Sequence, residues 1–177
     1  MTMTTREHPG HRPGLCPTDW LAAHLDDARV RIVDGSFHIP GSGRDAQAEF
    51  AQGHLPGAAF FDINAICDPE DPLPHMLPSP DAFARAVAAL GIGDEHRVVV
   101  YDQPGSQAAP RVWWMLRVFG HDDVLVLDGG LPKWRAEGRP VTTAPTPIVP
   151  APFTPRFRPH LVADRARVLA NLDTRHA

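Results

Sequence analysis

The sequence predicts an α/β fold in three layers, with a mostly parallel central sheet and helices on both faces. Near-continuous apolar runs rich in β-branched residues alternate along the chain with segments whose apolar residues recur at helical spacing. The apolar runs lack the alternation of a half-exposed strand, which indicates strands that are buried on both faces. Glycine follows several helical segments, where helices commonly end. Strands that alternate with helices are typical of a parallel sheet between helical layers.

The first half of the chain is predicted to contain a helix, a strand, a second helix and a second strand. Thr18 suits the N-cap of a helix through WLAAHL, because its hydroxyl can accept a hydrogen bond from a free amide of the first turn. RVRIVDG (29–35) predicts a short buried strand. DAQAEFAQG (45–53) predicts a short helix that ends at Gly53, and AAFFDI (58–63) predicts an extended segment.

The second half repeats this pattern after a long proline-rich loop over 66–80. Ser79 and Pro80 suit the N-cap and the first position of a helix that carries AFARAVAAL and ends near Gly91. Two predicted strand–helix pairs follow, namely HRVVVYD (96–102) with APRVWWMLRVF (109–119), and DVLVLDGG (123–130) with LPKWRAEG (131–138).

Composition argues against several classes of protein. With 177 residues, of which 43% are hydrophobic, the chain suits one globular domain with flanking segments. A formal net charge of −4 does not favour binding to nucleic acid, and no apolar run reaches the roughly 18 residues of a membrane span. Cys16 and Cys67 lack the spacing of a structural zinc site or a disulfide framework. We therefore expect no metal, no cofactor, and a reducing, cytoplasmic location.

Proline content and a short repeat indicate how the chain is divided. Residues 1–17 lack the apolar core of a signal peptide and are predicted to form a disordered tail. The domain itself is expected over 18–140, and the proline-rich segment 141–160 suits a semi-rigid connector between domains. After it, LANLDTRHA is similar to LAAHLDDAR (21–29), which precedes the first predicted strand. Residues 161–177 are therefore expected to form the first helix of a truncated second domain.

The most informative motif is FAQGHLPGAAFF (50–61), where Phe50 precedes His54-Leu-Pro-Gly-Ala with the spacing F-x-x-x-H-apolar-P-G-A. This motif resembles the signature of the rhodanese family. The segments FFDIN, PLPHMLP, VVVYD, APRVWWMLR and VLVLDGGLPKW also match, in order and spacing, the N-terminal domain of two-domain sulfurtransferases, most closely the 3-mercaptopyruvate sulfurtransferases. The resemblance covers roughly residues 18–175. We expect His54 to satisfy backbone groups and not to take part in catalysis.

The resemblance implies transfer of sulfur through a persulfide on a cysteine. In two-domain relatives, the loop that carries this cysteine follows a strand of the second domain, and its amides stabilise a thiolate. Here Asp102 occupies the corresponding position in the first domain, and a carboxylate cannot carry a persulfide. The loop that also contains Gly105 and Ser106 is therefore predicted to be an inactive counterpart. Asp102 is expected to accept amides near the start of the following helix.

Four other residues are candidates for supporting the substrate. The resemblance places His75 and Tyr101 toward the cysteine loop of the second domain, where a histidine can shuttle a proton or orient the donor. The alternatives are a capped loop histidine for His75 and packing at the end of the sheet for Tyr101. The family has an acid where this chain has Asn64, which can hydrogen-bond an imidazole but cannot stabilise its charged form. Asp62 is a nearby acid or a residue that ends a strand.

Arg111 and the two cysteines need separate explanations. A cation near the start of a helix is unfavourable, so Arg111 is expected to have a specific partner, as a structural or interdomain ion pair. Cys67 lies among acidic residues, which disfavour a thiolate, and Cys16 falls in the predicted tail. Neither cysteine follows a strand into a loop of amides, and we do not expect either to be the nucleophile.

Three functional hypotheses remain at this point. The favoured one is the N-terminal part of a two-domain sulfurtransferase, inactive alone, whose partners are the second rhodanese domain, a small-molecule sulfur donor and a thiol or cyanide acceptor. The donor is 3-mercaptopyruvate or thiosulfate, and the overall match favours 3-mercaptopyruvate. The second hypothesis is a stand-alone, non-catalytic module that binds or regulates a partner. The third is a small sulfurtransferase that acts through Cys67.

Overall fold

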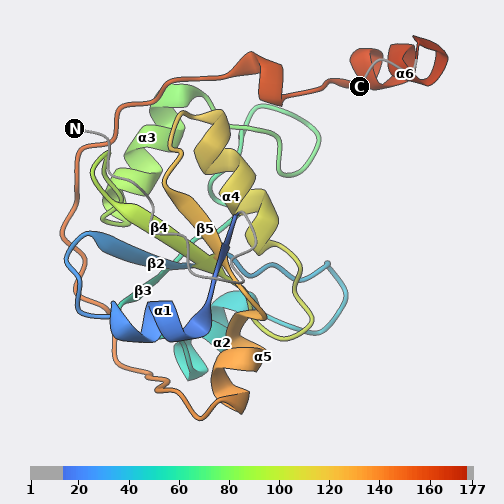
Figure 1. Cartoon of the computed structure of the whole chain (residues 1–177). Helices are drawn as coiled ribbons and strands as arrows, with labels where there is room; N and C mark the ends of the chain where they lie inside the picture. The colour runs from blue at the N-terminus through green and yellow to red at the C-terminus, as the bar shows by residue number, and fades with distance from the viewer. Residues whose placement is uncertain (1–13, 175–177) are drawn as a thin grey trace.

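The structure, a computed structural model, describes residues 14–174. Within that part of the chain, five strands form one parallel sheet in the order β1-β5-β4-β2-β3 (Figure 1). The strands are β1 (Leu15–Cys16), β2 (Val30–Asp34), β3 (Ala58–Phe60), β4 (Arg97–Tyr101) and β5 (Val124–Leu127). The helices are α1 (Thr18–Ala23), α2 (Ala46–Gln52), α3 (Pro80–Ala89), α4 (Ala109–Val118), α5 (Gly130–Ala136), the 3-10 turn η1 (Pro159–Leu161) and α6 (Arg165–Thr174).

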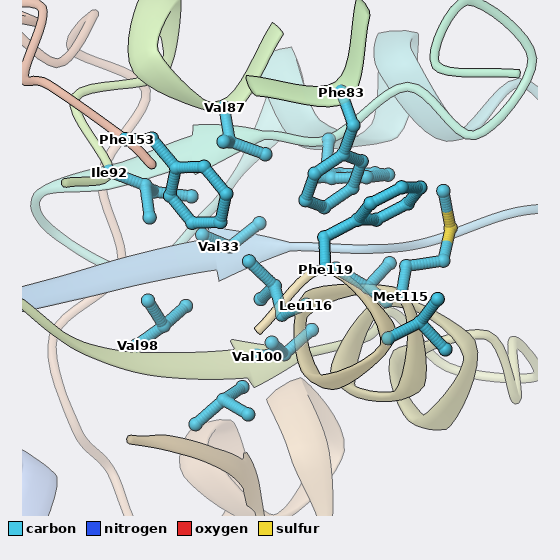
Figure 2. Packing of buried hydrophobic residues seen from close by; sticks show 14 of the residues in the cluster. Val33, Phe83, Val87, Ile92, Val98, Val100, Met115, Leu116, Phe119 and Phe153 are labelled. Carbon is cyan, nitrogen blue, oxygen red and sulfur yellow. The ribbon is translucent and has the colours of Figure 1, made fainter. Parts of the chain in front are cut away.

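Alternate residues of the central strands divide the core into two clusters, one on each face of the sheet. Val98 and Val100 of β4 pack with α3 and α4, as Figure 2 shows for the larger cluster. Val99 and Tyr101 of the same strand belong to the other cluster, together with Trp134 of α5 and residues of α1. Because successive side chains of a strand point to opposite faces, this division confirms the predicted three-layer α/β architecture.

Helix boundaries follow the local signals in the sequence, with one exception. The Ser79 hydroxyl accepts a hydrogen bond from the Ala82 amide at 3.3 Å, with Pro80 in the first position of α3, as predicted. The prediction for Thr18 was wrong, because Pro17 occupies the N-cap and Thr18 is the first residue of α1. The Thr18 hydroxyl donates to Glu137 at 2.6 Å, so a tertiary contact takes the group that a local cap would have used.

The predicted tail extended too far along the chain. Residues 1–13 lie outside the described part, but Leu15–Cys16 form the edge strand β1, which pairs with β5. The Val126 amide donates to the Gly14 carbonyl, and the Asp128 amide to the Cys16 carbonyl, both at 2.9 Å. A strand of two residues has no periodicity to detect, so only its pairing with β5 reveals it.

The proline-rich segment 141–160 runs along the domain and is fastened to it by hydrogen bonds. Thr142 forms an antiparallel bridge with His54, and the Thr146 hydroxyl donates to the Ala58 carbonyl at 2.7 Å, beside edge strand β3. Phe153 is buried in the larger core cluster. The segment therefore packs on the domain along part of its length. Its role as a connector to a second domain stays a prediction.

The C-terminal helix α6 contributes nothing to the core. It has no buried residue, and Val168, Leu169 and Leu172 each expose more than half of their surface. In Figure 1 it stands apart from the sheet and its covering helices. The helix predicted over 161–177 begins only at Arg165, because Leu161 ends η1 and residues 162–164 are not helical, while 175–177 lie outside the described residues. The assignment of this helix to a second domain stays a prediction. Among the described helices, none has the length and apolar character that crossing a membrane requires.

Candidate functional site

A cleft of about 290 Å³ opens beside the carboxyl ends of β2 and β3. Its walls are residues 36–38 after β2, residues 44–47 at the start of α2, and Phe60, Asp62 and Asn64 around the end of β3. In open α/β sheets, ligands bind outside the carboxyl ends of the strands. The cleft lies at that edge, which makes it the candidate site of this domain.

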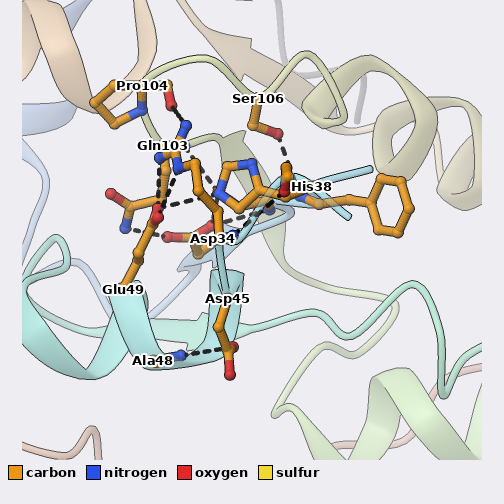
Figure 3. Close-up of polar contacts among 12 residues, drawn as sticks. Asp34, His38, Asp45, Ala48, Glu49, Gln103, Pro104 and Ser106 are labelled. Atoms are coloured by element: carbon orange, nitrogen blue, oxygen red, sulfur yellow. Dashed lines mark hydrogen bonds and ion pairs between the residues drawn. The ribbon is translucent and has the colours of Figure 1, made fainter. Parts of the chain in front are cut away.

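A buried polar network joins the end of β2 to the 102–108 loop (Figure 3). Asp34 is wholly buried and accepts hydrogen bonds from the Ser36 amide at 2.9 Å and from Gln103 Nε2 at 3.0 Å. The Ser36 hydroxyl in turn accepts the Gln103 amide at 2.7 Å. Burial raises the pKa of Asp34, although these hydrogen bonds oppose the rise. The network fixes the position of the loop relative to the sheet.

A second network crosses from α2 to the same loop. Arg44 Nε and Nη2 bind the two oxygens of Glu49 at 2.7 and 2.6 Å, and Nη1 donates to the Pro104 carbonyl at 2.6 Å. His38 Nε2 lies 3.0 Å from the second Glu49 oxygen (Figure 3). The hydrogen bonds with Arg44 are the main cause that lowers the pKa of Glu49. Arg44 thereby connects the cleft wall to the loop of Asp102.

Asp102 accepts an amide at the start of the helix that follows its loop, as expected from its chemistry. Asp102 Oδ2 accepts the amide of Ala109, the first residue of α4, at 3.2 Å, and its carbonyl accepts the Leu131 amide at 3.0 Å. Burial raises the pKa of Asp102. Gly105 has φ of 77°, and the Ser106 hydroxyl accepts the Phe37 amide at 3.2 Å. The loop is thus held by its own side chain and by the segment after β2.

His75 and Asn64 are in contact at the edge of the cleft. Asn64 Oδ1 lies 2.8 Å from His75 Nε2, and the ring of Phe37 meets the imidazole edge-on with 4.7 Å between centroids. Arg111 Nη2 donates to the main-chain carbonyl of His75. The structure therefore pairs the two residues that the family resemblance had linked.

Asp62 and Tyr101, unlike His75, have side chains engaged by backbone amides of the domain. Asp62 Oδ1 accepts the amides of Asn64 at 2.9 Å and Ala65 at 3.3 Å, so this carboxylate stabilises the turn after β3. Tyr101 is wholly buried, and its hydroxyl accepts the Leu55 amide at 3.3 Å. Burial raises the pKa of Tyr101 well above its usual range. For Tyr101 the structure therefore favours packing at the end of the sheet over a role in facing substrate.

Neither cysteine has the surroundings of a nucleophile. Cys16 is wholly buried in β1, and burial raises the pKa of its thiol to about 12. Cys67 Sγ donates to the Asn64 carbonyl at 2.9 Å in the loop after β3. Within residues 14–174, no group of three or more metal-ligating side chains is placed to hold an ion.

Arg111 and His54 have structural partners. Arg111 was expected to be a structural or interdomain ion-pair arginine; within residues 14–174 it forms no ion pair, and a pair with a second domain stays a prediction. Its contacts are the His75 carbonyl and the face of Trp114, whose centroid lies 5.6 Å from the guanidinium carbon. His54 has 1% of its surface exposed, and its ring nitrogens lie 2.8 and 3.2 Å from the carbonyls of Phe50 and Ala144. His54 therefore connects backbone segments, as predicted.

Sequence reasoning missed the group formed by His38, Arg44 and Glu49. These residues lie in SFHIP and in the segment from Arg44 through DAQAEF, which flank a turn between β2 and α2. The spacing of five residues between Arg44 and Glu49 matches neither helical pair spacing of three or four, and nothing in the sequence indicates a contact with Pro104. Only the approach of the loop after β4 makes Arg44 a link between two segments.

Comparisons with known proteins agree with this fold and this motif pattern. The family described as rhodanese-like domain matches residues 17–137. The thiosulfate/3-mercaptopyruvate sulfurtransferase 2 of Arabidopsis thaliana is 43% identical, over 88% of this chain and 52% of its own length. The thiosulfate sulfurtransferase of Bos taurus is 44% identical, over 91% of this chain and 56% of its own. The chain thus spans about half the length of the curated relatives it matches.

Solved structures give the same result. The crystal structure of SseA from Escherichia coli, described as a 3-mercaptopyruvate sulfotransferase with the rhodanese fold, superimposes with a TM-score of 0.85 at 38% identity. That alignment covers 93% of this chain and 63% of the other. The Tum1 protein of Saccharomyces cerevisiae superimposes with a TM-score of 0.80 at 25% identity, covering 90% of this chain and 56% of the other.

Proposed function

The chain belongs to the rhodanese-like domain family, and from this premise we propose that it is the non-nucleophilic first domain of a sulfurtransferase. The observation that carries the proposal is that Asp102, which the resemblance puts at the position of the family's nucleophile, accepts the amide of Ala109 at 3.2 Å. A carboxylate cannot accept a sulfane sulfur, so the persulfide belongs to a cysteine of a second domain. The domain described here contributes one wall of the active site that the two domains share.

The proposed reaction moves one sulfur atom in two displacements. A thiolate of the second domain attacks the sulfur of 3-mercaptopyruvate, forming an S–S bond as the C–S bond breaks, and the carbon fragment leaves as the enolate of pyruvate. With thiosulfate, the S–S bond of the donor breaks and sulfite leaves. An acceptor thiol or cyanide then attacks the outer sulfur and restores the thiolate. The relatives' names include both donors, and we favour 3-mercaptopyruvate.

His75 suits the proton transfers of this reaction. A histidine can shuttle a proton, and with Nε2 turned toward Asn64 the Nδ1 atom of His75 can accept a proton from the donor thiol or hold the donor in place. Asn64 holds the other side of the ring at 2.8 Å by a hydrogen bond without a negative charge. We therefore propose that His75 is oriented by a neutral partner in this chain and is not one member of a charged relay.

One observation supports the alternative of a binding module. Ile39, Leu73 and Met76 are large apolar residues that expose 75%, 61% and 41% of their surface in the loops after β2 and β3. Large apolar residues exposed in loops at this edge of the sheet suit a surface that binds a protein partner. In the favoured proposal that partner is the second rhodanese domain. In the alternative it is a separate protein that the domain binds or regulates.

An assay of sulfur transfer tests the proposal. The chain alone, given 3-mercaptopyruvate or thiosulfate with cyanide or a thiol, should show no turnover and no added sulfur by intact-protein mass spectrometry. Cys67→Ser should behave like the unchanged chain. Turnover that Cys67→Ser abolishes would contradict the proposal and support the third hypothesis. Reading the DNA beyond codon 177 is the complementary observation, since the favoured hypothesis expects a second rhodanese domain with a cysteine loop there.

A further inference from the structure

The backbone of His75 adopts a conformation that its residue type does not favour. Among the non-glycine residues of the described chain, His75 is the one with positive φ, at 61°. The left-handed region is unfavourable for a residue with a Cβ atom, and such conformations persist where surrounding contacts enforce them. They occur preferentially at functional sites. The contacts that hold His75 therefore bear on its role.

One of these contacts comes from Arg111, the third residue of α4. Its Nη2 donates to the His75 carbonyl while its guanidinium lies over the Trp114 ring. Its Nε is buried and has no hydrogen-bond partner within residues 14–174. A cation in the first turn opposes the helix dipole, and a buried unpaired donor is costly. Neither feature favours the stability of α4, so the bond to His75 is the contact that distinguishes this arginine.

The ring of His75 is held by two residues that line the cleft. Asn64 Oδ1 lies 2.8 Å from Nε2, and the ring of Phe37 packs edge-on against the imidazole. A carbonyl oxygen only accepts hydrogen bonds, so Nε2 carries the proton when the ring is neutral. Nδ1 then keeps its lone pair and is available as an acceptor.

We propose that Arg111 is a positioning residue for His75. By binding the main-chain carbonyl, Arg111 keeps the backbone of His75 in the left-handed conformation in which its ring meets Asn64 and Phe37. The ring then stays in a single tautomer at the wall of the cleft, with Nδ1 available to a substrate or a second-domain residue. The inference rests on the proposed function for the purpose of the site, whereas the geometry is measurable on this chain alone.

Nitrogen-15 NMR of the imidazole of His75 tests the proposal, at a pH where the ring is neutral. The unchanged chain should show two widely separated ring-nitrogen signals, as a fixed Nε2–H tautomer requires. Arg111→Gln should bring the signals together toward an averaged position, because a relaxed backbone releases the ring from Asn64. Arg111→Lys keeps a positive donor and should restore part of the separation. Arg117→Gln is the matched control, since Arg117 lies on the same helix over Trp113.

A folded Arg111→Gln variant that keeps the original separation overturns the proposal, and so does an Arg117→Gln variant that shifts the signals equally. If Arg111→Gln does not fold, NMR of the unchanged chain measures instead how fast the Cζ–Nη2 bond of Arg111 rotates. Slow rotation about the Cζ–Nη2 bond of Arg111 supports the contact with His75, and free rotation overturns it. Sulfur transfer by the isolated chain would count against the proposed function while leaving these NMR results to decide the role of Arg111.

Discussion

Replacing Asp34 should destabilise the domain, because its carboxylate is the shared acceptor of a buried network. The Ser36 amide and Gln103 Nε2 donate to it at 2.9 and 3.0 Å, and Asp34 itself is wholly buried. Asp34→Ala removes the acceptor of three donors, since the Ser36 hydroxyl also donates to Asp34 at 2.5 Å. Gln103 Nε2 keeps the Gly53 carbonyl at 3.3 Å, so the two Ser36 donors are left unpaired. At about 1–3 kcal/mol for each unpaired donor, the free energy of unfolding should fall by about 2–6 kcal/mol. That is a large part of the roughly 5–15 kcal/mol of a typical domain.

Asp34→Asn separates the contribution of the hydrogen bonds to stability from the contribution of the charge. The amide has the same shape and keeps one acceptor oxygen, so the expected loss at acid pH is about 1–3 kcal/mol. Burial raises the pKa of Asp34, so the folded state binds this proton more tightly than the unfolded state. The resulting stability is fully present below the ordinary pKa of 3.8 and is lost as the pH rises through the raised value. The destabilisation by Asp34→Asn should therefore be largest at acid pH and smaller at neutral pH.

Urea denaturation followed by tryptophan fluorescence at several pH values measures both effects. Asp26→Asn is the control, because Asp26 is an exposed carboxylate in the turn after α1 and its replacement should change the free energy of unfolding by less than about 0.5 kcal/mol. The reasoning is refuted if Asp34→Ala stays within about 1 kcal/mol of the unchanged chain. It is also refuted if the effect of Asp34→Asn is the same at every pH.

Three further changes test other parts of the structure. Phe83→Ala should lower the free energy of unfolding, measured by urea denaturation, by about 3–5 kcal/mol. Phe83 is wholly buried and its ring stacks on that of Phe119, with 4.2 Å between centroids. A decrease below about 1 kcal/mol would contradict this packing. Ser79→Ala should cost about 1 kcal/mol by removing the N-cap of α3, and an unchanged urea midpoint would argue against that cap. Burial lowers the pKa of His121 below its usual 6.5, so stability is present above that pH and falls as acid protonates the unfolded chain first. Thermal denaturation of His121→Leu should show a shallower loss of stability on the acid side, whereas an equally steep loss would assign the acid sensitivity to other groups.

The sequence predicted most of the architecture because the signals of the main elements are local. The run HRVVVYD and the Ser79-Pro80 start of α3 each depend on neighbouring residues, and both elements are present as β4 and α3. The strand β1 was missed, inside a tail predicted over residues 1–17, for the opposite reason. Leu15–Cys16 become a strand through pairing with β5, more than one hundred residues away, and no local pattern carries that information.

In the candidate site, too, some features could be identified from local sequence and others could not. Asp102 could be identified from the sequence, because its position follows from the strand that precedes it and its inability to carry a persulfide follows from its chemistry. The partner of Arg111 could not be identified. An unfavourable cation in the first turn of a helix showed that a partner was needed, but the bond to the His75 carbonyl depends on how the loop over 66–80 returns to α4.

The sequence by itself determined the fold class, the family and the absence of a cysteine from residues 102–108, the loop after β4. These depend on residue types, spacing and the chemistry of single side chains. Tertiary structure decided which groups meet at the cleft. It also decided that the Tyr101 side chain is buried in the core. Arg44 reaches Pro104, Asp34 reaches Gln103 and Tyr101 reaches Leu55 across dozens of residues. Such contacts form only when the crossovers of a parallel sheet bring distant loops to one edge.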